Sequence, residues 1–187
     1  AKEALGDISL NTWDVAFDPK LVSRLKACGV HMLDAPEDVL PAALRWLKLD
    51  PDSKKADDIR KAAAALVKVR GNVRKFHSSE YINGLANGDI CMAVGYSGDV
   101  LQAKKRAEEA KNGVEIAYII PREGAQVAID SFAIPADAPH PAEAHAFIDF
   151  MLRPDIAARN VDIVAYASAN LAAKEKIKPA ILADKGV

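Results

Sequence analysis

The sequence lacks a membrane-spanning run, a secretory leader and any excess of one charge. No segment approaches the roughly 18 apolar residues that a transmembrane helix needs. Because the chain starts with Ala1-Lys2-Glu3 instead of an initiator Met, we expect a fragment or a processed chain. Lysine and arginine number 25 against 26 aspartates and glutamates, a net charge of −1, so the composition gives no reason to expect nucleic acid as a partner.

Metal-binding and catalytic motifs are also missing. The four histidines and two cysteines show neither HxxxH nor CxxC spacing, which argues against zinc. Neither G-x-G-x-x-G nor G-K-[ST] occurs, so no nucleotide cofactor is indicated. The segment GYSGD at 95–99 differs from the nucleophile elbow G-x-S-x-G, because Asp99 stands where the second glycine belongs. We therefore expect no enzyme, no cofactor and no metal; a small α/β hydrolase is the weaker alternative, without a recognisable nucleophile and base.

The sequence does contain clear signals that separate helices from strands. Asp18-Pro19 supplies an N-cap and a first-turn proline for a helix that Gly29 would end. Residues 30–33 predict a short buried strand, and the continuous apolar run at 90–94 is typical of a strand buried on both faces. Strand-like stretches also cover 114–120 and 126–134, and helical patterns lie between these segments. The alternation predicts an α/β architecture with a largely parallel sheet.

Two acidic loops follow predicted strands, at 34–38 and 95–99. Ligands of parallel sheets bind beyond the carboxyl ends of the strands, so these loops are the candidate site. The alternative for Asp38 and Asp99 is a purely structural role as helix N-caps. The densest basic stretch, at 104–106, is followed by Glu108-Glu109, which indicates charge pairs along a solvated helix face and not a binding patch.

Segments 76–91 (FHSSEYINGLANGDIC) and 95–103 (GYSGDVLQA) resemble the putrescine- and spermidine-binding receptors of bacterial polyamine ABC importers, closest to the putrescine type. The resemblance runs from about Trp13 to Asn170 and implies a type II periplasmic-binding-protein fold, with a mixed, largely parallel sheet flanked by helices. Shorter matching stretches are LDAP at 33–36, EAKNGV at 109–114, IPREGA at 120–125, FAIPADA at 132–138, LRPD at 152–155 and YASAN at 166–170.

Receptors of this family close two lobes around the ligand, and the resemblance covers only part of that architecture. It implies that residues 1–122 form the second, C-terminal lobe and that residues 123–187 are the return segment into the first lobe, whose N-terminal part has no counterpart here. It further implies a monomer in the periplasm that binds a polyamine and delivers it to an inner-membrane ABC permease, without a cofactor.

The resemblance also carries a set of ligand-binding residues onto this chain. Asp99 and Asp130 match amine-binding aspartates, and Asp38 stands where the family has a glutamate. Tyr96 replaces the usual tryptophan and Ala128 a phenylalanine, so a longer or bulkier amine, or another cationic solute, is the alternative ligand. The full set is Asp38, Tyr96, Asp99, Asp130 and Tyr166, the last as an aromatic wall.

The two cysteines, Cys28 and Cys91, are compatible on their own with a structural bridge, two buried thiols or half of a metal site. Both match cysteine positions of the resembled family. Because the periplasm is oxidising, the resemblance implies a Cys28–Cys91 disulfide that closes a loop of about 60 residues.

Overall fold

The computed structural model describes residues 1–184 of the chain. The chain divides into two compact units, Ala1–Gln126 (unit 1) and Val127–Val187 (unit 2). Among the described residues, no helix is both long enough and apolar enough to cross a membrane.

Unit 1 is built on a small parallel sheet with the strand order β2-β1-β3. The central strand β1 (Val30–Met32) is fully buried and pairs with β2 (Lys75–Phe76) on one side and β3 (Met92–Ala93) on the other, both in parallel. The predicted α/β architecture with a parallel sheet is therefore confirmed, although the strands are shorter than the apolar runs that predicted them.

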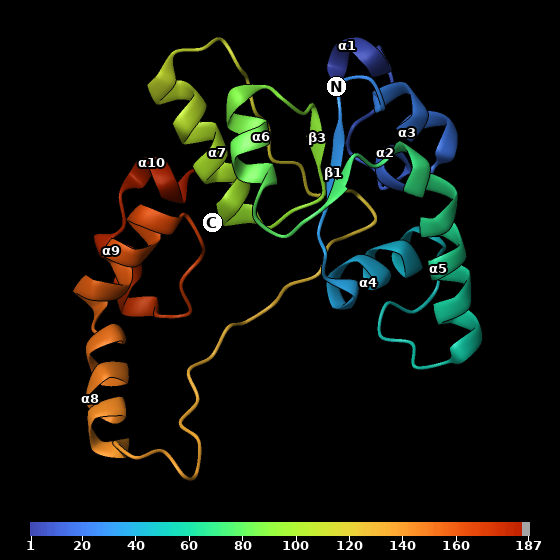
Figure 1. Ribbon diagram of the computed structural model, residues 1–187. Coiled ribbons are helices and arrows are strands. Elements are labelled where there is room, and N and C mark those ends of the chain that lie inside the picture. Colours follow the sequence, from blue (N-terminus) through green and yellow to red (C-terminus); the bar gives the residue numbers. More distant parts are fainter. Residues whose placement is uncertain (185–187) are drawn as a thin grey trace. The chain divides into compact units, whose positions relative to one another are not determined.

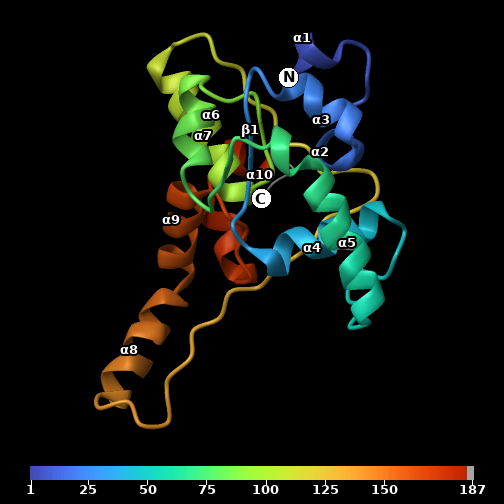
Figure 2. The ribbon, with the colours of Figure 1, turned by 45° about the vertical axis from the view of Figure 1, so that its right-hand side comes forward.

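Helices cover this sheet on two sides, as Figures 1 and 2 show. Helices α6 (Tyr81–Asn87) and α7 (Ser97–Ala110) pack against each other on one side. The other side carries α2, α3 and α5, and the core between the layers is formed by apolar side chains such as Phe17, Leu25 and Met32. The remaining elements of unit 1 are α1 (Lys2–Leu5), α2 (Asp14–Phe17), α3 (Pro19–Leu25), α4 (Pro36–Trp46), α5 (Ala56–Val69) and the 3₁₀ turn Arg70–Asn72.

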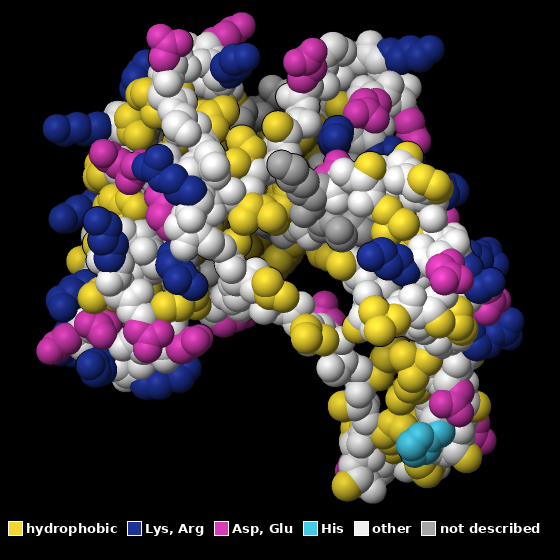
Figure 3. All heavy atoms as spheres, turned by 180° about the vertical axis from the view of Figure 1, so that it is seen from behind, with side chains coloured by type: hydrophobic (Ala, Val, Ile, Leu, Met, Phe, Trp, Pro, Cys, Tyr) yellow, Lys and Arg dark blue, Asp and Glu magenta, His cyan; other side chains and the backbone are white. Residues whose placement is uncertain are grey.

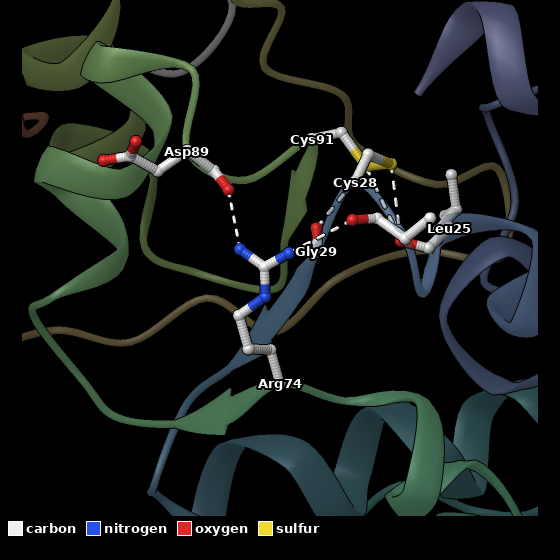
Figure 4. The surroundings of a disulfide bond; sticks show 7 residues. Leu25, Cys28, Gly29, Arg74, Asp89 and Cys91 are labelled. Atoms are coloured by element: carbon white, nitrogen blue, oxygen red, sulfur yellow. Dashed lines mark hydrogen bonds between the residues drawn. A yellow bond between two sulfur atoms is a disulfide. The ribbon is translucent and has the colours of Figure 1, made fainter.

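The predicted disulfide between Cys28 and Cys91 is present, with 5.5 Å between the two Cα atoms and a sequence separation of 63 residues. Cys28 follows α3, and Cys91 directly precedes β3 (Figure 4). Next to the bridge, the backbone N–H of Cys91 donates to the carbonyl oxygen of Gly29 at 3.1 Å. The bond thus joins the chain entering β1 to the chain entering β3.

Arg74 braces the same region without contacting sulfur. Its guanidinium donates to the backbone oxygen of Asp89 at 2.7 Å and to that of Ala27 at 3.2 Å (Figure 4). Gly29 has a φ of +95°, and a Cβ there would lie 2.5 Å from Arg74 Cζ. The backbone conformation therefore favours glycine at this position, and a larger residue would also displace the end of the flexible Arg74 side chain.

Two expected strands are not formed within the described residues. Residues 114–120 and 126–134 are extended but belong to no ladder, so the prediction of strands there is wrong. In the first segment Val114, Ile116 and Tyr118 are half-buried while their neighbours are exposed. The first segment has the predicted period of two, but a strand also needs a backbone partner along its edge, and within residues 1–184 neither segment has one.

The chain leaves unit 1 through a hydrogen-bonded contact with its own N-terminal part. The Glu123 carboxylate accepts from the Thr12 hydroxyl and from the Trp13 backbone N–H, and Trp13 Nε1 donates to the Gly124 oxygen at 2.8 Å. Burial alone would raise the pKa of Glu123, but these hydrogen bonds and the charge of Arg122 outweigh it and lower the pKa. This contact fixes residues 122–124 against residues 11–13.

His31, in the middle of β1, is 7% exposed, and its Nδ1 atom has no hydrogen-bond partner among residues 1–184. Burial lowers the pKa of His31, and the charges of Arg74 and Lys75 lower it further, against a smaller opposite effect of Glu80. The imidazole is therefore neutral in the folded protein near pH 7.

We expect unit 1 to lose stability as the pH falls below about 6.5. The unfolded chain takes up a proton on His31 near that pH, whereas the folded chain resists it, so protonation favours unfolding. Thermal unfolding at pH 7.5 and pH 5.0 would measure the drop in melting temperature between the two pH values. This drop should be smaller in His31→Leu than in the wild type. The control is His145→Leu, at an exposed position; an equal pH dependence in His31→Leu and the wild type would contradict the prediction.

Unit 2 is helical and has a small core of its own. It consists of an extended stretch from Val127, then α8 (Pro141–Met151), α9 (Pro154–Val164), the 3₁₀ turn Leu171–Lys176 and α10 (Pro179–Leu182). The core contains Ala157, Ala158, Val161, Ala173 and Ile177. Phe132 and Phe147 pack edge to face, 5.9 Å between ring centroids, yet both are more than half exposed.

Charged side chains of both signs are interspersed over the face drawn in Figure 3. On α7, Lys105 Nζ lies 4.0 Å from Glu109 Oε1, four residues along the helix. This is the type of pair that the sequence predicts for this helix, and both side chains are well exposed, so its contribution to stability is small.

Candidate functional site

The candidate site lies where β1 and β3 end and α4 and α7 begin. Both strands run in the same direction, so their carboxyl ends meet at one edge of the sheet. Asp38 is in the first turn of α4, Tyr96 directly precedes α7, and Asp99 is in its first turn. Backbone N–H groups at helix N-termini favour negative charge, which explains why carboxylates are tolerated in both first turns.

A hydrogen bond between Tyr96 and Asp38 joins the two helices. The Tyr96 hydroxyl donates to Asp38 Oδ2 at 2.7 Å, across 58 residues of sequence. This hydrogen bond, together with burial and the charges of Asp38, Glu37 and Asp99, raises the pKa of Tyr96 to about 12. The phenol therefore keeps its proton at every physiological pH and acts as a neutral donor to the carboxylate.

Tyr81, which the sequence interpretation did not select, completes the arrangement. Its hydroxyl donates to Asp99 Oδ2 at 2.7 Å and accepts from the Tyr96 backbone N–H at 3.0 Å, and its side chain is fully buried. The signal available in the sequence was a tyrosine at the start of a helix, because a buried phenol needs a polar partner. Which partner it finds depends on tertiary contacts that the sequence does not display.

Asp38, Tyr96 and Asp99 are thus brought together within unit 1 by direct hydrogen bonds and by Tyr81. The prediction that the two aspartates could be N-caps is wrong. The N-cap positions of α4 and α7 are Ala35 and Tyr96, and neither makes a side-chain capping bond.

The other two predicted site residues belong to unit 2. Asp130 is exposed on the extended stretch before α8, and Tyr166 is half-buried just after α9. Their role in ligand binding stays a prediction.

Ser79 and His77, which lie before α6, are not arranged as a catalytic serine and its base. Ser79 Oγ lies 3.4 Å from His77 Nδ1, but the same nitrogen accepts the backbone N–H groups of Ser79 and Glu80, each at 3.2 Å. His77 therefore stabilises the turn that leads into α6. Among residues 1–184, no three His, Cys, Asp or Glu side chains are grouped as metal ligands would be.

Comparison with known proteins extends over the whole chain. A family model described as bacterial extracellular solute-binding protein matches residues 1–186. The putrescine-binding periplasmic protein PotF of Escherichia coli is 48% identical over 188 residues, and SpuD of Pseudomonas aeruginosa, of the same description, is 46% identical over 187. Each alignment covers 100% of this chain and 51% of the relative.

A solved structure described as a putative spermidine/putrescine ABC transporter from Listeria monocytogenes superposes with a TM-score of 0.82 at 28% identity. The superposition covers 99% of this chain and 54% of that one. The chain therefore spans about half the length of the relatives that it matches.

Proposed function

Because the chain belongs to the family of bacterial extracellular solute-binding proteins, we propose that it is part of a periplasmic receptor that binds a putrescine-like polyamine and delivers it to an ABC permease. Solute-binding proteins are receptors and not enzymes. The observation that carries the proposal is the pair of carboxylates, Asp38 and Asp99, held by tyrosines at one edge of the sheet.

A polyamine is a flexible apolar chain that carries protonated amines. Carboxylates orient such amines through charge-assisted hydrogen bonds, and an aromatic face attracts an ammonium group by roughly 0.5 to 2 kcal/mol. Asp38 and Asp99 supply the acids and Tyr96 an aromatic ring. We assign Asp130 and Tyr166 to the same ligand on the family resemblance. The relatives PotF and SpuD are putrescine-binding proteins, which supports putrescine as the model ligand.

The proposed mechanism is closure of two lobes around the ligand. Residues 1–122 would be the second lobe and residues 123–187 the return segment into the first. Ligand binding favours the closed form, which the permease of the inner membrane recognises. The receptor would act as a monomer, and the disulfide is in keeping with an oxidising compartment such as the periplasm.

The test is calorimetric titration of the full-length receptor with putrescine, cadaverine, spermidine, spermine and agmatine. We expect one of these amines to bind, and we expect Asp130→Ala to lower the affinity for that amine. If none binds, the polyamine proposal fails. Another cationic solute is then the second candidate, because alanine at position 128 provides no side chain to stack on a slender amine.

Titrated alone, this 187-residue chain is expected to bind polyamines weakly or undetectably. In the proposed mechanism both lobes supply contacts, so a chain with only one complete lobe loses part of the binding free energy. The same calorimetric series measures this, with the full-length receptor as the positive control. Equal affinity of the two proteins would contradict the division of the ligand contacts between lobes.

A further inference from the structure

We propose that Tyr81 is a positioning residue of the amine site, whose buried hydroxyl sets the carboxylate of Asp99 and the backbone of Tyr96. This role rests on the proposed function, since it concerns the same site. Tyr81 itself need not touch the ligand; it acts through the two residues that it holds.

The backbone of the loop before α7 lies directly on the Tyr81 ring. A Cβ built at Gly95 would come within 2.5 Å of Tyr81 Cε2 and 2.6 Å of Cζ, distances that real side chains do not adopt. Only glycine lets the chain approach the ring so closely. The buried ring, at 0% exposure, thus forms the floor on which the loop before α7 rests.

The two hydrogen bonds of the Tyr81 hydroxyl have defined directions: it accepts one and donates the other. A phenol has one proton, and here the Tyr96 N–H group is a donor that the phenol oxygen must accept. The hydroxyl proton therefore points to Asp99 Oδ2. This orients one oxygen of the carboxylate through a neutral donor, so this hydrogen bond does not itself neutralise the acid.

A continuous series of hydrogen bonds connects the two acids, Asp99 and Asp38. Asp99 is linked to Tyr81, Tyr81 to the backbone of Tyr96, and the Tyr96 hydroxyl to Asp38. The three contacts, of 2.7, 3.0 and 2.7 Å, connect α6, α7 and α4 at the edge of the sheet. Loss of the Tyr81 hydroxyl would remove this hydrogen bond from Asp99 and the acceptor of the Tyr96 N–H.

The experiment is a double-mutant cycle in the full-length receptor, with the amine of highest affinity as the probe. Tyr81→Phe keeps the ring and removes the hydroxyl, and we expect affinity to fall about tenfold. In the Asp99→Ala background, the same change should lower affinity by clearly less than tenfold, because one of the two residues that Tyr81 holds is already gone. A purely structural defect would weaken both backgrounds alike.

Tyr118→Phe is the matched control, since Tyr118 is a half-buried tyrosine of the same unit; it should leave affinity unchanged. Wild-type affinity in Tyr81→Phe, or an undiminished tenfold loss in the Asp99→Ala background, would overturn the role of Tyr81 while leaving the receptor proposal intact. Absence of binding by the wild type would overturn both. If Tyr81→Phe does not fold, Gly95→Ala serves instead: it displaces the loop from the ring, and an unchanged affinity would refute the proposal.

Discussion

Asp99→Ala in the full-length receptor is expected to weaken polyamine binding about a hundredfold, or about 2.7 kcal/mol. The carboxylate lies in the first turn of α7 and already accepts the Tyr81 hydroxyl, so it is held in one orientation before a ligand arrives. Its removal leaves an ammonium group without a charged acceptor in the closed site, which costs more than the loss of an exposed ion pair. Calorimetry with wild type and variant measures the difference.

Asp57→Ala is a matched control, because Asp57 also lies in the first turn of a helix, α5, and the change removes the same charge. Asp57 forms an exposed ion pair with Arg60, away from the candidate site. We expect its affinity to remain within about twofold of the wild type, in line with the small contribution of surface pairs. Equal losses in the two variants would show that net charge, and not the position of Asp99, governs binding.

Replacing both cysteines, Cys28→Ser with Cys91→Ser, is expected to lower the free energy of unfolding by about 4 kcal/mol. The bridge joins residues 63 positions apart, and its loss gives the unfolded chain the conformational freedom of a long open loop. Chemical denaturation followed by circular dichroism would measure the change. The variant should unfold at a markedly lower denaturant concentration with a similar or steeper slope.

Reduction provides the control for this substitution. A reductant should destabilise the wild type by a comparable amount and leave the double serine variant unaffected. If both the substitution and the reduction lower the free energy of unfolding by less than about 1 kcal/mol, the reduced, unfolded chain is already constrained in this region.

Features specified by neighbouring residues could be predicted from the sequence. Helix α3 begins at Pro19 as expected, because Asp18 accepts the Lys20 backbone N–H at 2.8 Å and proline suits the first turn. The turn at Gly29 was predicted for similarly local reasons, but the two acidic loops are shorter than predicted, because α4 begins at Pro36 and α7 at Ser97. The disulfide was predicted from the family resemblance, since two cysteines alone leave their partners open.

Features that depend on distant partners could not be predicted in this way. Residues 114–120 have the alternation of a strand, but no neighbouring backbone pairs with them in the described part of the chain. Asp38 and Asp99 were chosen as candidates from the sequence and their role in ligand binding stays a prediction, whereas the hydrogen bonds that orient them come from tyrosines 58 and 18 residues away. Tyr81 was missed because its apolar position in the helix pattern conceals the role of its hydroxyl.

The hydrogen bonds around the disulfide also hold its two chain segments together when the sulfur–sulfur bond is reduced. The Arg74 guanidinium binds the carbonyls of Ala27 and Asp89, one and two residues before the cysteines, and the Cys91 N–H binds the Gly29 oxygen; none of these bonds involves sulfur. A reduced protein that stays folded therefore keeps both thiols at a high effective concentration, so that attack on a mixed disulfide is intramolecular and fast. Adducts with small thiols would be short-lived in such a protein, and oxidation can follow folding instead of guiding it.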